Sequence, residues 1–165
     1  MKKLAVLAAS ALALSAVSAA QAHEYQKGAL TIIHPWVRPA VKGANGAVYL
    51  SIKNAGSEAD KLIAAESPVA GKTGLHETRD ENGVMKMRPV EGGVEVQPGT
   101  AQELKPGGTH IMLMDLKEGL EEGASVPLTI TLAKAGTVTV EVKVEKTTPD
   151  SAAAMPMHGM DHSKH

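Results

Sequence analysis

Two histidines and two methionines stand at spacings that would let them bind one metal ion. His110 and Met112 lie two residues apart in an apolar stretch. Because side chains alternate between the two faces of a strand, both should point to the same side. His76 and Met87 lie in two neighbouring stretches joined by an Asn-Gly turn signal, and a hairpin there would bring both toward the same end. The sequence therefore predicts a cluster of imidazole and thioether ligands.

Such a donor set is soft and uncharged, which favours Cu(I) over hard cations such as Mg²⁺ or Ca²⁺. The chain has no cysteine, so thiolate chemistry, zinc-thiolate sites, iron–sulfur clusters and a blue-copper centre are excluded. Neutral ligands leave the charge of the ion in place. Binding should then be tight but reversible, as a protein that gives its metal away requires.

Other candidate ligands have simpler interpretations. Met85 shares a strand face with Met87 and competes with it as a ligand, and a methionine in a strand can also simply fill a gap in the core. His34, before a proline, is interpreted as structural. Glu77 either orients an imidazole or is a solvated strand carboxylate.

The elements that would position these residues are short strands. Apolar, β-branched stretches alternate with Gly, Pro and Asn turn signals, and no sustained helical period occurs between residues 28 and 146. The predicted strands cover residues 30–33, 47–52, 61–65, 74–78, 84–90, 94–97, 101–104, 110–116, 126–133 and 138–144. This pattern predicts an all-β fold, an antiparallel sandwich or barrel with Greek-key connections.

The first residues have the pattern of a secretory signal peptide. Lys2 and Lys3 precede an apolar run over residues 4–20, and Ala20-Gln21-Ala22 is a small-x-small cleavage pattern. We expect residues 1–22 to be removed after Ala22, which leaves a periplasmic protein that does not span the membrane and whose copper-binding domain covers residues 23–146. The new amino terminus, His23, offers a further Cu(II) chelate, although a polar first residue is also common by chance.

The end of the chain is a biased segment. Residues 147–154 read as a linker, and residues 155–165 carry three methionines and three histidines. We expect residues 147–165 to form a flexible, disordered tail rather than part of the fold. The candidate ligands of a second copper site, for Cu(I) or Cu(II), are Met155, Met157, His158, Met160, His162 and His165. The competing interpretation is a flexible end that only improves solubility.

The combined motif resembles that of the periplasmic PCu(A)C copper chaperones. Its parts are His76, ten intervening residues, Met87, a spacer, and His110-x-Met112, set among the segments 83–90, 104–114 and 34–38. The spacer before His110 holds twenty-two residues, one more than is usual. The spacing of the family motif selects Met87 over Met85, which implies that Met85 and Met114 are core residues or neighbours of the ligands. The resemblance implies a cupredoxin-like β-sandwich, one Cu(I) held by these four residues, and delivery of copper to cytochrome c oxidase subunit II or to another oxidase assembly factor.

Two function classes follow, a copper chaperone with a client and a copper buffer or resistance protein without one. An enzyme is not expected, because no catalytic constellation can be assembled and a fully ligated copper leaves no position for a substrate. A net charge of −1 and only three aromatic residues argue against nucleic-acid binding. A purely structural immunoglobulin-like module would leave the His-x-Met strand and the tail unexplained.

Overall fold

The structure, a computed structural model, describes residues 24–146. The signal peptide and the tail predicted at residues 1–22 and 147–165 lie outside this range. Between residues 24 and 146 the chain forms strands and no helix. The strands are β1 (Glu24–Lys27), β2 (Leu30–Val37), β3 (Gly46–Asn54), β4 (Asp60–Glu66), β5 (Ala70–Glu81), β6 (Val84–Pro89), β7 (Val94–Val96), β8 (Ala101–Leu104), β9 (Thr109–Leu116), β10 (Ser125–Leu132) and β11 (Gly136–Val144).

The prediction of an all-β, mostly antiparallel fold is confirmed. Each of the predicted stretches corresponds to one of the strands β2 to β11, and β1 is additional. The strands join in the order β6-β5-β9-β3-β2-β11-β10-β4-β7, with β1 beside β2 and β8 beside β3. Only the β2–β11 pair is parallel among the described strands. Neighbours far apart in sequence, such as β3 and β9, show the crossovers that Greek-key connections produce.

A single hydrophobic core lies between the two halves of this sheet. Residues of β4, β10 and β11 and residues of β3, β5 and β9 belong to one buried cluster. Along β9, Ile111 and Leu113 belong to this cluster, while the buried residues His110 and Met112 alternate with them and do not. The sheet region around β9 therefore has a core face and an opposite face, and the candidate ligands lie on the second.

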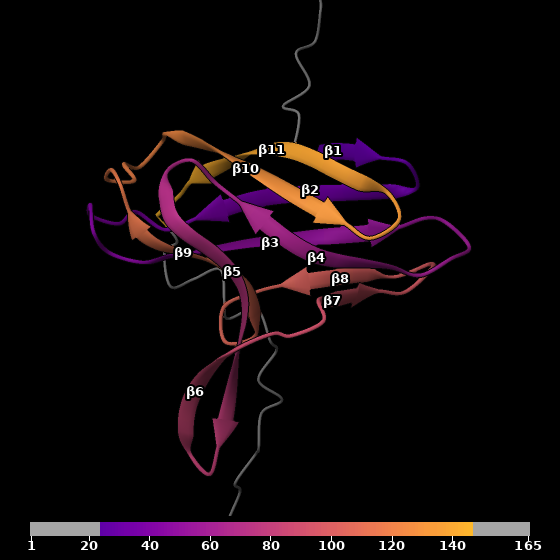
Figure 1. Ribbon diagram of the computed structural model, residues 1–165, viewed down its shortest axis with the longest axis horizontal. Helices are drawn as coiled ribbons and strands as arrows, with labels where there is room; N and C mark the ends of the chain where they lie inside the picture. Colours follow the sequence, from indigo (N-terminus) through magenta and orange to yellow (C-terminus); the bar gives the residue numbers. More distant parts are fainter. Residues whose placement is uncertain (1–23, 147–165) are drawn as a thin grey trace, which may run out of the picture.

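The β5–β6 hairpin extends away from the rest of the molecule (Figure 1), and β6 is an edge strand that pairs with β5 alone. Asn82 and Gly83 both have positive φ angles, 59° and 82°, as a two-residue type I′ turn requires. All six residues of β6 are exposed. At the other end of β6 the backbone N–H of Val90 donates to the carbonyl of Leu75, so the hairpin is fixed at its base and free at its tip.

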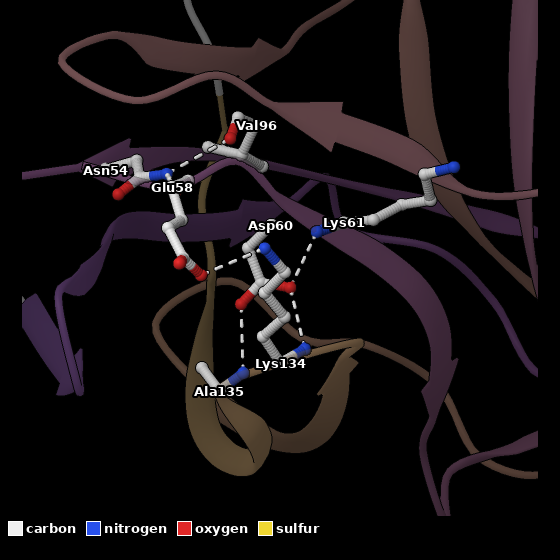
Figure 2. Close-up of polar contacts among 7 residues, drawn as sticks. All are labelled: Asn54, Glu58, Asp60, Lys61, Val96, Lys134 and Ala135. Atoms are coloured by element: carbon white, nitrogen blue, oxygen red, sulfur yellow. Dashed lines mark hydrogen bonds and ion pairs between the residues drawn. The ribbon is translucent and has the colours of Figure 1, made fainter. Parts of the chain in front are cut away.

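Asp60 fixes the opposite end of the sheet. Its side chain is buried and accepts hydrogen bonds from the backbone N–H groups of Lys61, Lys134 and Ala135 at 2.7, 2.8 and 2.9 Å (Figure 2). Burial raises the pKa of Asp60, but these hydrogen bonds and the charge of Lys134 outweigh it and hold the pKa below its ordinary value. The carboxylate thereby ties the start of β4 to the turn between β10 and β11.

Candidate metal site

The register of three strands places the predicted ligands on one face of the sheet. His76 on β5 lies directly opposite His110 on β9, and Gly74 lies opposite Met112. On the other side of β5, Thr78 lies opposite Met87 of β6. Directly paired residues and residues two apart share a face, so His76, His110, Met112 and Met87 point to the same side. Extended-strand alternation, which the sequence shows, is what puts them there.

The two imidazoles lie side by side. The ring centroids of His76 and His110 are 6.2 Å apart, and their planes differ by 20°. His110 is 3% exposed. Its Nδ1 lies 3.1 Å from the carbonyl oxygen of Gly108, which can only accept, so Nδ1 carries the proton and Nε2 keeps its lone pair. This second nitrogen is buried and has no hydrogen-bond partner.

His76 presents a similar unpaired nitrogen. Its Nδ1 is buried without a hydrogen-bond partner, and the ring lies back over Gly74. A Cβ atom added to Gly74 would lie 3.2 Å from Cε1 and 3.7 Å from Nδ1 of His76, and 3.6 Å from Cε of Met114. The absence of a side chain at Gly74 therefore leaves clearance for the His76 ring, which an added Cβ would crowd, while the Met114 methyl group would be in ordinary contact with it.

The four predicted ligands differ sharply in exposure. Met112 is 9% exposed, whereas Met87 is 50% exposed. His76 and Met87 are diagonal neighbours across β5 and β6, a spacing of about 7–8 Å that long side chains can bridge. The structure thus brings His76, His110 and Met112 together on β5 and β9 and places Met87 one row further toward the hairpin tip.

The remaining candidate residues lie in different surroundings. Met85 is 57% exposed, so its interpretation as a core residue is wrong. Met114 is half-buried on the ligand face, beside Gly74. Glu77 lies on the opposite face, where its carboxylate bonds Nε of Arg79 at 2.9 Å. His34 lies at an irregularity of β2, with Nε2 3.2 Å from a carboxylate oxygen of Glu145.

Sequence reasoning missed three features of the site. The imidazole of His110 is oriented by a backbone carbonyl, not by Glu77. The clearance at Gly74 was not foreseen. A row of rings also leads away from the ligands, with Tyr49 of β3 6.2 Å from His110 and Trp36 of β2 4.7 Å from Tyr49, measured between ring centroids. Tyr49 is buried and closes the side of His110 that faces away from His76.

Within residues 24–146, no group of three or more His, Asp or Glu side chains could hold a metal ion.

Comparison with known proteins agrees with this geometry. Residues 30–144 match the model of a family described as "Putative lipoprotein LpqE-like". The chain belongs to this LpqE-like family, the PCuAC copper chaperones. The matched region contains every described strand except β1, and all four predicted ligands.

Among relatives of the LpqE-like chain, a protein of Leifsonia xyli subsp. xyli named "Putative lipoprotein Lxx21020" is 34% identical over 128 residues, which are 78% of this chain and 76% of that protein. Similar solved structures include the apo PCuAC domain from PmoF1, with 30% identity, a TM-score of 0.64, and coverage of 76% of this chain and 100% of that one.

Two further solved structures are named as copper forms. The copper-bound PCuAC domain from PmoF2 is 27% identical and has a TM-score of 0.64, and the match covers 76% of this chain and 99% of the PmoF2 domain. The solution structure of CuI-DR1885 from Deinococcus radiodurans is 28% identical and has a TM-score of 0.52, and the match covers 68% of this chain and 76% of the DR1885 chain. Copper is thus bound by structural relatives of this LpqE-like chain.

Family membership confirms two further expectations. The fold matches that of the PCuAC domains, and the family is one of non-catalytic copper chaperones, so the chain is not an enzyme. Its description as a lipoprotein family is consistent with an exported protein. Among the described residues no helix is long and apolar enough to cross a membrane.

Proposed function

We propose that this LpqE-like protein is a periplasmic copper chaperone that binds one Cu(I) through His76, Met87, His110 and Met112. The observation that carries the proposal is a pair of buried, unpaired imidazole nitrogens, Nδ1 of His76 and Nε2 of His110, facing the same side of adjacent strands. An unpaired buried polar group costs about 1–3 kcal/mol. A metal ion bound to both nitrogens would remove that cost.

The methionines complete the set in a way that suits transfer. Two imidazoles and two thioethers are neutral, soft ligands that favour Cu(I). Three of the four sit on β5 and β9, which are packed against the core, while Met87 is on the exposed edge strand. One ligand that is solvent-accessible gives an acceptor protein a bond to replace. We propose that the acceptor is the copper site of cytochrome c oxidase subunit II, or an assembly factor that serves the oxidase.

An anaerobic Cu(I) competition titration tests the metal site. We expect His110→Ala to weaken Cu(I) binding by more than about 100-fold, since even groups that only orient ligands are worth about 10- to 100-fold. The matched control is His34→Ala, because His34 is a half-exposed histidine paired with Glu145 outside the site. Equal affinity of wild type and His110→Ala would overturn the proposed site.

A copper-transfer assay distinguishes a chaperone from a copper buffer. We expect the copper-loaded protein to metallate the soluble copper domain of oxidase subunit II in vitro. If a correctly folded acceptor stays empty while the protein keeps its Cu(I), the protein is a buffer that sequesters copper.

A further inference from the structure

Met85 is a second exposed thioether beside the proposed copper site. On the ligand face, Met112 and His110 are 9% and 3% exposed, whereas Met87 and Met85, which lie nearer the hairpin tip, are 50% and 57% exposed. This order follows the fold, since β9 is covered, β6 is an edge strand and Met85 lies near the hairpin tip. The four positions mark a path from the buried end of the face to solvent.

The register puts Met85 on this path rather than beside it. Met85 lies opposite Asp80, Met87 opposite Thr78, and Pro89 opposite His76. Residues two apart on one strand share a face and are about 7 Å apart. The sulfurs of two flexible side chains at this separation can converge on one ion, because each thioether is carried by three rotatable bonds.

The surroundings of Met85 leave its sulfur free for a ligand. On the opposite face of the hairpin, Glu81 pairs with Lys86 at 2.8 Å and with Arg88 at 2.5 Å, and Glu77 pairs with Arg79. These three cations and two carboxylates are paired with one another and do not face Met85. The carboxylate of Asp80, across from Met85, accepts the backbone N–H of Gly83 at 2.7 Å and adds a negative charge that attracts a cation.

We propose that Met85 is a transfer ligand, which together with Met87 forms an outer station where Cu(I) pauses as it enters or leaves the His76–His110–Met112 site. This inference rests on the proposed function. The step is an exchange of ligands without redox change: a bond between Met85 sulfur and Cu(I) forms as a bond from a buried ligand breaks. The ion stays Cu(I), and no proton moves.

A transfer ligand changes rates and leaves equilibrium affinity alone. The test loads the full mature chain anaerobically with half an equivalent of Cu(I) and follows the transfer to excess bicinchoninate by stopped-flow absorbance. In Met85→Leu, which conserves volume, we expect transfer to slow about 3- to 10-fold, as for loss of an interaction made mainly in the transition state, with affinity changed less than about twofold.

The controls separate a sulfur ligand on this face from a general effect on the hairpin. Met85→His keeps a soft donor and should restore the rate. The double variant Met85→Leu/Lys86→Met keeps a thioether at the tip but on the opposite face, and should stay slow. An unchanged rate in Met85→Leu would overturn the inference. A loss of affinity as large as that of Met87→Leu would overturn it too, because Met85 would then be a permanent ligand.

The same experiment distinguishes a failure of this inference from a failure of the proposed function. If His110→Ala releases copper no faster than wild type, the copper is not held at the strand site, and the proposed function fails first. If His110→Ala releases copper much faster but Met85→Leu behaves like wild type, only the transfer role of Met85 is lost.

Discussion

At the scale of single residues, the orientation of the donors depends on atoms that are not ligands. The carbonyl of Gly108 accepts from Nδ1–H of His110 and so leaves Nε2 for a metal. It also accepts the backbone N–H of Thr78, which ties the loop before β9 to β5. Gly74 acts differently, by leaving room. Its backbone is not in the left-handed region, so an alanine there is tolerated by the main chain.

We therefore expect Gly74→Ala to fold but to bind copper poorly. A methyl group 3.2 Å from Cε1 of His76 must displace the ring, and a misplaced ligand should weaken Cu(I) binding about 10- to 100-fold, as loss of an orienting partner does. Stability should hold or rise slightly, since glycine inside a strand costs about 0.5–1 kcal/mol relative to alanine. Urea unfolding and Cu(I) competition on the same samples measure both.

Gly108→Ala is the matched control for this residue. It also lies close to His110, but its added Cβ would meet only Lys105 atoms at 3.6 and 3.7 Å, which are ordinary contacts. Its carbonyl is unchanged, so copper affinity should be unchanged. Equal affinities in Gly74→Ala and wild type would show that the His76 ring does not need this clearance.

The residue types of the site could be predicted from the sequence, but their surroundings could not. Alternation along a strand is enough to put His110 and Met112 on one face, and the Asn-Gly turn is enough to pair the strands of His76 and Met87. Whether a face is covered depends on other strands. For that reason Met85, which shares the pattern of Met87 and was interpreted as a core residue or a neighbour of the ligands, is not in the core but exposed.

At the scale of elements, the chain contains no cysteine and therefore no disulfide bond. Hydrogen bonds from buried polar side chains connect its turns instead. Asn54, buried at the end of β3, donates to the carbonyls of Glu58 and Val96 at 2.8 and 3.1 Å (Figure 2). Asp60 then holds the β10–β11 turn through the backbone N–H groups of Lys134 and Ala135. These two side chains connect three separate turns at the end of the sheet where β4 and β7 lie.

Asp60→Asn should reduce the free energy of unfolding by about 2 kcal/mol at neutral pH. The amide has one acceptor oxygen and no charge, so all three backbone N–H groups lose a charged partner and at least one loses its acceptor; hydrogen bonds to charged groups are worth about 1.5–3 kcal/mol. Urea unfolding of the two proteins from pH 2 to pH 7 measures the difference.

The sign of the pH dependence follows from the lowered pKa of Asp60. A carboxyl group whose pKa is lower in the folded than in the unfolded state stabilises the fold above its ordinary value of 3.8. The contribution disappears as the pH falls through the folded pKa. The gap between wild type and Asp60→Asn should therefore be constant from pH 5 to pH 7 and shrink below about pH 4. A gap that stays constant down to pH 2 would contradict this role.

Local patterns predicted the described strands β2 to β11 but missed β1 and both ends of β5. β1 reads Glu-Tyr-Gln-Lys and has no apolar alternation. It is held by Tyr25, whose hydroxyl accepts the backbone N–H of Glu141 at 2.9 Å, a contact between residues far apart in the sequence. β5 extends through charged residues at its end because β6 pairs with it there. Long-range partners, which no local window contains, decided both.

At the scale of the whole molecule, the fold separates stability from metal exchange. The buried cluster lies on one face of β5 and β9, and the proposed ligands lie on the other, next to the sheet edge formed by β6. Copper can therefore reach the site without opening the core. Strand β6, which carries Met87 and Met85, contributes no residue to the buried cluster, and β5 contributes only Ala70 and Leu75, both before His76. The tip of the hairpin can therefore move at little cost to the rest of the domain.

This separation also predicts how the end of the chain contributes. Residues 155–165 carry six potential ligands, and all four proposed ligands of the strand site come before β11 in the sequence. Removing them should lower the number of copper ions bound per chain, yet leave the one site that His110→Ala abolishes at unchanged affinity. Parallel Cu(I) titrations of the full mature chain, the shortened chain and the shortened His110→Ala chain test this.

Unchanged stoichiometry after truncation would show that the terminal segment holds no copper. A shortened chain that binds none at all would instead place every copper ion there and favour sequestration over delivery.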